Sequence, residues 1–180
     1  MAYHDDEWGV PVRDGRQLFE MLNLEGAQAG LSWRTVLGKR DAYRKVFDEF
    51  DVTRLENWSE EKIAAALLNP GIIRNRLKVL GVIRNARAVQ HLFYDDLDAF
   101  SLFLWSFVDG VPQQRRALSD YPTKTDASYR MSQALKKMDF TFVGSTICYA
   151  FMQAVGMVND HAETCFRQTP VKFLAAEWHL

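Results

Sequence analysis

Hydrophobic residues recur along most of the chain every three to four positions, which is the period of an amphipathic α-helix. The clearest case follows Asp14, where Leu18, Leu22 and Ala29 fall on one helical face, and where Asp14 with Gln17 forms a capping-box pattern. The same period, with a capping residue such as Ser32 or Ser59 at several starts, predicts further helices over residues 32–50, 60–68, 73–93, 98–108, 125–138 and 144–156.

Alternating patterns typical of β-strands are almost absent, and D-F-T-F-V (residues 139–143) is the one short candidate. Neither internal repeats nor low-complexity segments interrupt the helical pattern. We therefore predict an all-α protein that forms a single domain over residues 1–180. The loop over residues 109–125, which carries Pro112, Arg115 and Arg116, is expected to separate two helical lobes.

The composition is that of a soluble globular protein large enough to bury a core, with 180 residues, 48% of them hydrophobic and 25% charged. A formal net charge of -1 does not by itself indicate a nucleic-acid-binding protein, although a local basic stripe is compatible with it. The two cysteines, Cys148 and Cys165, are too few for a disulfide framework. Because the sequence also lacks a signal-peptide pattern and a membrane-spanning stretch, we expect a cytoplasmic protein without a membrane partner.

Glu25 occupies an unusual position, on the same helical face as Leu18 and Leu22. A carboxylate on an apolar face costs free energy unless it is paired or hydrogen-bonded. Periodicity alone favours a structural role, as a cap or as the partner of an arginine; the alternative is a carboxylate that lines a pocket and stabilises a cationic ligand. Trp33 follows the small, flexible stretch at residues 26–30, and its spacing favours core packing over ligand binding.

The segment L-L-N-P-G-I-I-R-N-R-L-K (residues 67–78) predicts a helical hairpin with a tight Pro-Gly turn, within an element of about residues 60–93. The free amides at the start of its second helix, together with Arg74, Arg76 and Lys78, suit a DNA backbone phosphate. The pattern is that of a helix-hairpin-helix element, although other helical hairpins also turn on Pro-Gly.

The segment N-D-H-A-E-T-C (residues 159–165) combines a capping pattern with metal-binding side chains. Asp160 and Glu163 predict a short capped helix, in which His161 and Cys165 lie one turn apart and can reach one metal ion. A histidine and a cysteine at this spacing are more often unrelated residues. Because a structural zinc site takes four ligands, others must come from elsewhere, and His4 is the candidate for a third.

Four longer motifs occur in order along nearly the whole chain. They are A-Y-H-D-D-E-W-G-V-P, L-F-E-M-L-N-L-E-G-A-Q-A-G-L-S-W, N-P-G-I-I-R-N-R and F-V-G-S-T-I-C-Y-A-F-M-Q-A-V-G-M-V-N-D-H, the last followed by cysteine four residues later. Together they resemble the 3-methyladenine DNA glycosylase I family of the helix-hairpin-helix glycosylase superfamily. The resemblance implies an all-helical fold with two lobes around a base-binding cleft.

The activity implied by the resemblance is hydrolysis of the N-glycosidic bond of 3-methyladenine in double-stranded alkylated DNA, which releases the free base. Tyr3 and Trp33 match the family's aromatic pocket residues, and Glu25 matches the carboxylate that hydrogen-bonds the adenine edge. N3-methylation places positive charge on the purine, and cation–π attraction in a dry site is worth roughly 1–2 kcal/mol. The resemblance reverses the structural interpretation of Glu25 and makes it the catalytic residue, through recognition and electrostatics rather than proton abstraction.

The resemblance also implies how DNA is held. Leu31, with Gln28 and Gly30, matches the loop that wedges into the duplex where the flipped base was, which offsets the cost of unstacking. The residues that match the phosphate-binding hairpin are Gly71, Arg74 and Arg76. No motif positions a lysine for Schiff-base chemistry, so we expect a monofunctional enzyme without strand cleavage. The superfamily's usual catalytic aspartate is also missing from this family, which is why Glu25 is expected to act through recognition and electrostatics.

In the family a zinc ion joins the two ends of the chain, and His4, His161 and Cys165 match three of its four ligands. The fourth, a cysteine before the histidine, has no counterpart in a sequence that begins at Met1, and neither has one aromatic pocket residue. We expect these three residues to hold zinc with water as a fourth ligand, more weakly than a full set. The acids at residues 5–7 are interpreted as a solvated turn.

Two alternatives to the enzyme remain at this stage. One is a non-enzymatic helix-hairpin-helix module that binds DNA in a salt-sensitive way but has lost base excision; intact Glu25 and Trp33 argue against it, because a clamp needs neither. The other is a purine-binding or protein-interaction domain on the same scaffold. We expect a monomer in each case.

Overall fold

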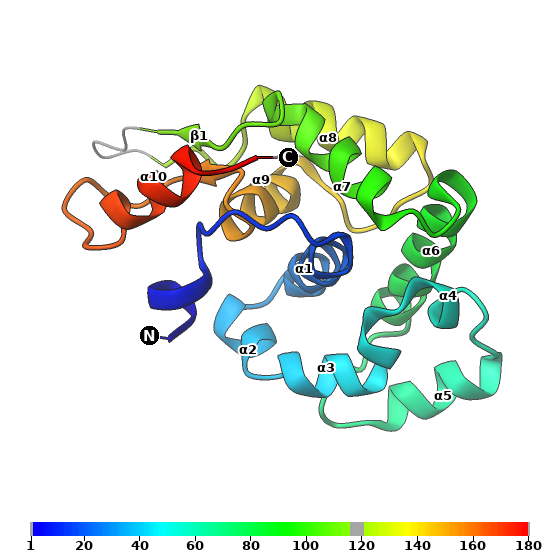
Figure 1. Cartoon of the computed structure of the whole chain (residues 1–180). Helices are drawn as coiled ribbons and strands as arrows, with labels where there is room; N and C mark the ends of the chain where they lie inside the picture. The colour runs from blue at the N-terminus through cyan, green and yellow to red at the C-terminus, as the bar shows by residue number, and fades with distance from the viewer. Residues whose placement is uncertain (1, 116–120, 180) are drawn as a thin grey trace.

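The computed structural model describes residues 2–115 and 121–179, and these ranges are mostly helical (Figure 1). In chain order the elements are the terminal helical turn η1 (Tyr3–Glu7), α1 (Gly15–Gln28), α2 (Trp33–Leu37), α3 (Arg40–Val46), η2 (Asp48–Phe50), α4 (Val52–Leu55), α5 (Glu60–Leu68), α6 (Arg76–Phe93), α7 (Leu97–Trp105), η3 (Ser106–Val108), β1 (Gln113–Gln114), α8 (Asp126–Lys137), α9 (Ser145–Ala154), β2 (Val158–Asn159) and α10 (Gln168–Ala176). The predicted all-α class is confirmed.

Helix α1 occupies the middle of the molecule (Figure 1). On one side it packs against α7 and α9, and α8 covers α9; on the other side it contacts α2 and α6, and α6 in turn carries α4 and α5. Its leucines and its one phenylalanine are buried in the hydrophobic core, Leu18 and Phe19 without any exposed surface. The two helical groups that meet on α1 are the two lobes that the family resemblance implies.

Side-chain caps explain where several helices begin. The Asp14 carboxylate accepts from the backbone N–H of Gln17 at 2.7 Å and starts α1. Ser32 and Ser59 start α2 and α5 in the same way, as their positions in the sequence predict. Since each cap satisfies amides that a helix leaves free, these starts depend on local sequence more than on packing.

Two predictions about chain organisation are wrong. The helix expected over residues 32–50 is divided into α2, α3 and η2. The first break follows Gly38, a residue type that disfavours helix relative to alanine, and the second falls where residues 48–50 have positive φ angles. The loop over residues 109–125 does not separate the lobes: α7, η3 and α8 on its two sides pack in the same lobe, and the change of lobe falls between α6 and α7. Arg116 of that loop lies outside the described residues.

The strand expected over residues 139–143 is also wrong. Asp139 and Phe142 have φ angles of +69° and +56°, which no strand accommodates. The Phe142 side chain instead fits between α1 and α6, where a Cβ added to Gly26 or Gly81 would come within 3.0 Å or 2.8 Å of it. The apolar run therefore fills an interhelical gap. The two-residue parallel pairing of β1 with β2 is the sheet that the described residues form.

No helix in the described part of the chain is long and apolar enough to cross a membrane.

Candidate active site

Three residues predicted to line a pocket meet where α1, α2 and the terminal turn η1 converge. Glu25, in the last turns of α1, is 4% exposed. The rings of Tyr3 on η1 and Trp33 at the start of α2 contact each other with centroids 5.4 Å apart and planes tilted by 51°. The first three elements of the chain thus place two aromatic rings and one carboxylate together, as the resemblance implies.

Each of these residues buries a polar atom that has no hydrogen-bond partner: the Tyr3 hydroxyl, Oε2 of Glu25 and Nε1 of Trp33. Buried polar groups in proteins are almost always hydrogen-bonded, because a buried donor or acceptor without a partner costs about 1–3 kcal/mol. Three such atoms at one place indicate a site shaped for a polar ligand that supplies the missing partners.

The electrostatics of the site follow from this burial. Burial raises the pKa of Glu25 to about 8, because the charged carboxylate is taken out of water and has no cation beside it. Burial also raises the pKa of Tyr3, and the negative charge of Glu25 raises it further, so the two groups are close enough to interact. The site is therefore one in which a positive ligand stabilises the ionised form of Glu25.

The terminal segment that carries Tyr3 is fixed by backbone contacts across the molecule. Val12 donates its N–H to the carbonyl of Val155 at 3.1 Å, and its own carbonyl accepts from the Trp105 indole at 2.9 Å. Gly156 allows the close approach, since a Cβ there would lie 2.4 Å from the nitrogen of Pro11. The chain end is therefore part of the packed structure.

Sequence reasoning missed an ion-pair network beside the site, in which Glu7 takes part although its side chain is 46% exposed on the terminal turn, as expected. The guanidinium of Arg40, which is 8% exposed, donates to Glu7 Oε2 at 2.5 Å and to Glu20 Oε1 at 2.8 Å. Arg44 donates to both oxygens of Glu20. Glu20 lies among the buried residues of α1, and an acid at such a position is the signal that the sequence offers. Its arginine partners are determined by tertiary packing.

The wedge loop, which we define as residues 28–31, follows the C-terminal end of α1. Leu31 is 41% exposed at its tip. Gly30 has a φ of +79°, which favours glycine, and nothing lies within 4 Å of the place where its Cβ would be. Gln28 is half-buried. An exposed leucine on a loop of small residues has the geometry that intercalation into a duplex requires.

The predicted hairpin is present between α5 and α6, at residues 69–75. Gly71 packs closely on α3, where a Cβ would lie 2.7 Å from that of Ala42, and its amide donates to Asn69 Oδ1 at 2.8 Å. Arg74 is exposed, whereas Arg76 pairs with Glu60 at 2.8 Å. The Gly71 amide and the Arg76 guanidinium, both assigned to DNA, therefore already have partners within the protein.

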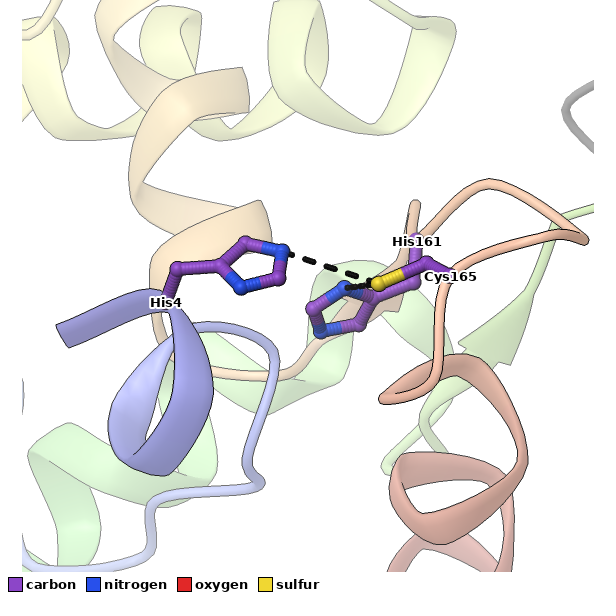
Figure 2. A group of neighbouring side chains, drawn as sticks. All are labelled: His4, His161 and Cys165. Atoms are coloured by element: carbon purple, nitrogen blue, oxygen red, sulfur yellow. Dashed lines mark hydrogen bonds between the residues drawn. The ribbon is translucent and has the colours of Figure 1, made fainter. Parts of the chain in front are cut away.

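The candidate metal ligands also converge, as Figure 2 shows. Cys165 Sγ lies 3.5 Å from His161 Nδ1 and 3.7 Å from His4 Nε2, and all ligand atoms lie within 4.8 Å of one another. Ligands of a tetrahedral zinc ion with Zn–N and Zn–S bonds of ordinary length are separated by about 3.5 Å. The spacing therefore fits zinc, and a hollow of about 430 Å³ beside the cluster gives water access as a fourth ligand.

The remaining ring nitrogens of the two histidines are held by acceptors. His161 Nε2 lies 3.1 Å from the carbonyl oxygen of Trp8, and His4 Nδ1 lies 2.8 Å from Asp5 Oδ1. When these nitrogens donate, the lone pairs of His161 Nδ1 and His4 Nε2 point at the cluster, which is the orientation that metal-binding histidines need.

The short helix expected after Asp160 does not form. Asp160 is buried and accepts from the Tyr149 hydroxyl at 2.5 Å and from Gln153 Nε2 at 2.8 Å instead of capping a helix. His161 and Cys165 are brought together by a turn. Burial of the acid in the lobe, which local sequence does not reveal, accounts for the error.

Comparisons with known proteins place this fold and site in a class, the DNA glycosylases, which hydrolyse N-glycosidic bonds. Within that class the chain belongs to the methyladenine glycosylase family, whose model matches residues 1–168. The chain is 51% identical over 167 residues to DNA-3-methyladenine glycosylase 1 of Escherichia coli (strain K12), a match that covers 92% of this chain and 89% of that protein.

Solved structures give the same result. A crystal structure of 3-methyladenine DNA glycosylase I superposes with a TM-score of 0.88 at 54% identity, covering 92% of this chain and 91% of the other. A variant of 3-methyladenine DNA glycosylase I in complex with 3-methyladenine superposes with a TM-score of 0.86 at 32% identity, covering 93% and 90%. The expected family and its all-helical fold are confirmed.

Proposed function

We propose that the chain flips 3-methyladenine out of alkylated double-stranded DNA and excises it by hydrolysis, releasing the free base without cleaving the strand. The observation that carries this proposal is the group of three unpartnered buried polar atoms on Tyr3, Glu25 and Trp33. A methylated purine offers donors and acceptors at its edges for these atoms, and a cationic face for the two rings.

Glu25 acts in recognition. Its ionised form is costly in the empty site, as its raised pKa indicates, and a cationic base that enters offsets that cost. When the C1′–N9 bond breaks, its electron pair moves to the base and the positive charge moves to the sugar. An anion held against the base therefore favours capture of the charged substrate over retention of the neutral product.

The sugar carries the developing charge, and DNA phosphates stabilise it. Water then adds to C1′ and loses a proton to solvent, which completes the hydrolysis. Tyr3, Glu25 and Trp33, from which the site is built, do not form Schiff bases, and this supports release of the base without strand cleavage.

Base binding requires a movement of the terminal turn. The Tyr3 and Trp33 rings are in direct contact at 5.4 Å, a distance typical of an aromatic pair without a third ring between them. A base that stacks between them has to separate them. Both rings lie on five-residue elements, but η1, which carries Tyr3, has no buried residue, whereas α2 is anchored by the buried Val36.

For DNA, we propose that Leu31 fills the gap left by the flipped base while Gln28 and Gly30 shape the wedge loop. The exposed Arg74 on the hairpin contacts backbone phosphate, together with the amides that begin α6. We further propose a structural zinc ion on His4, His161 and Cys165, which supplies folding free energy by joining the two ends of the chain. The protein works as a cytoplasmic monomer.

Incubation with methylated duplex DNA, followed by chromatography of the released bases, tests the activity. We expect free 3-methyladenine above the rate in buffer, and a lower rate with Glu25→Gln. Glu177→Gln, which changes an exposed acid directly after α10, serves as the control. DNA binding without base release would instead support the non-enzymatic module.

A further inference from the structure

Lys78 does not lie where a phosphate-binding lysine would be expected. Its ammonium group donates to the backbone carbonyl of Ala27 at 2.7 Å and to that of Ala29 at 2.8 Å. Both carbonyls belong to the C-terminal end of α1, where a helix has unpaired acceptors and a partial negative charge. Partial burial lowers the pKa of Lys78, which means that keeping the ammonium charged at this contact costs free energy of desolvation.

The wedge loop has few other connections. Its internal hydrogen bonds are local, from Ala29 to Gly26 and from Leu31 to Gln28. Among the hydrogen bonds of the described residues, the two from Lys78 are those that join the backbone of residues 27–31 to a distant element. A loop with so few contacts samples many conformations unless such a contact restricts it.

The other end of this connection is the hairpin. Lys78 stands in the first turn of α6, and its backbone N–H donates to the capping oxygen Asn75 Oδ1 at 3.1 Å. Asn75 is the last residue of the hairpin, one position after the exposed Arg74. The lysine therefore links the segment proposed to hold phosphate to the segment proposed to enter the duplex.

We propose that Lys78 is a positioning residue that sets the wedge loop at a fixed place relative to the hairpin, so that Leu31 enters the base stack when the hairpin is on the backbone. The proposal rests on the proposed function of these two segments and adds to it the residue that couples them. Lys78 acts through Leu31 and not by contact with base or phosphate.

Lys78→Met tests the proposal because it keeps the aliphatic stem and removes the donors. We expect kcat/KM on duplex DNA that contains 3-methyladenine to fall roughly tenfold, since hydrogen bonds from a charged group are among the stronger ones. Affinity for free 3-methyladenine stays at the wild-type value because Tyr3, Glu25 and Trp33 are unchanged. Lys78→Arg, which retains donors of similar reach, restores part of the loss.

Two further measurements separate positioning from direct contact. In a Leu31→Ala background Lys78→Met changes kcat/KM less than twofold, since the element that it positions is gone. The salt dependence of binding to undamaged duplex keeps the wild-type slope in Lys78→Met, whereas Arg74→Gln, the matched loss of one hairpin cation, lowers the slope by about 0.9.

Additive effects of Lys78→Met and Leu31→Ala would overturn the proposal, as would a lower salt slope in Lys78→Met, which means a phosphate contact, or an unchanged kcat/KM. Failure of the proposed function is a different result, namely no base release by the wild type. In that case the insertion of Leu31 beside an abasic site, followed by fluorescence of a neighbouring 2-aminopurine, still reports on the coupling to Lys78.

Discussion

The guanidinium of Arg40 donates to the carboxylate of Glu7 at 2.5 Å and so ties the terminal turn, with Tyr3 on it, to the body of the protein. Arg40 is fixed in turn by Glu20 on α1. The position of Tyr3, one of the two aromatic rings at the candidate active site, therefore depends on an ion pair that does not itself belong to the base-binding residues.

Replacing Glu7 by glutamine tests this dependence. We expect Glu7→Gln to weaken binding of free 3-methyladenine several-fold, because Tyr3 is held less firmly, while stability changes by less than about 1 kcal/mol, since half-exposed ion pairs contribute little. Calorimetric titration and thermal unfolding measure the two effects. Asp6→Asn, one residue earlier and exposed, is the control, and equal affinities of both variants would contradict the role of the Arg40–Glu7 contact.

The raised pKa of Glu25 predicts a pH-dependent stability. The carboxyl has an ordinary pKa of 4.5 in an unfolded chain and a pKa of about 8 in the fold, so between these values the folded protein binds more protons than the unfolded chain. The contribution of this group is complete below pH 4.5 and is lost as pH rises to about 8. Glu25→Gln removes that loss, so the variant gains stability relative to wild type across this window.

Denaturant unfolding at intervals from acid to mildly alkaline pH measures the gain. One pKa unit corresponds to about 1.4 kcal/mol, and we expect the difference to exceed that amount at the alkaline end. Glu177→Gln should follow the wild-type profile. Parallel profiles for wild type and Glu25→Gln would show that Glu25 does not carry the effect.

Removal of the metal should loosen the chain ends. Elemental analysis of the purified protein is expected to give one zinc per chain, and His4→Ala to reduce occupancy, whereas His179→Ala, which changes an exposed histidine, leaves it intact. A chelator lowers the melting temperature of the wild type because a ligand that binds only the folded state stabilises it, by about 2.7 kcal/mol at a hundredfold excess over Kd. A melting temperature that is the same with and without the chelator would contradict a structural metal.

The wedge loop gives a substitution that separates DNA handling from base recognition. Leu31→Ala should lower excision from duplex DNA by roughly tenfold, because the small side chain no longer fills the vacated stack. Binding of free 3-methyladenine should not change. Leu174→Ala on α10 removes a leucine of the same 41% exposure and is the matched control for general surface effects. An equal loss in both variants would argue against intercalation.

Local sequence was sufficient for much of the fold and for part of the site. Helix starts at Asp14, Ser32 and Ser59 were predictable because a cap and the amide it satisfies lie within three residues. Glu25 stood out because a carboxylate on an apolar face needs an explanation, and the family motifs supplied one. Both signals are contained in a short window of sequence.

The rest depended on contacts between distant segments. Nothing near Lys78 in the sequence indicates that its ammonium reaches Ala27, 51 residues earlier. The Arg40–Glu7 pair and the inward Phe142 are of the same kind, since each is decided by how helices pack and not by local preference. Sequence patterns predicted the residues that we propose carry the chemistry, whereas the residues that position them depend on packing.

Tyr3 and His4 are adjacent in the chain and lie on one helical turn, yet one belongs to the aromatic site and the other to the metal cluster. Any movement of the turn that admits a base also moves a metal ligand. Metal binding and base binding are then thermodynamically linked, and linkage is reciprocal: if zinc changes the affinity for 3-methyladenine by some factor, the base changes the affinity for zinc by the same factor. We therefore expect a metal bound at the terminal turn to affect base recognition as well as to join the chain ends.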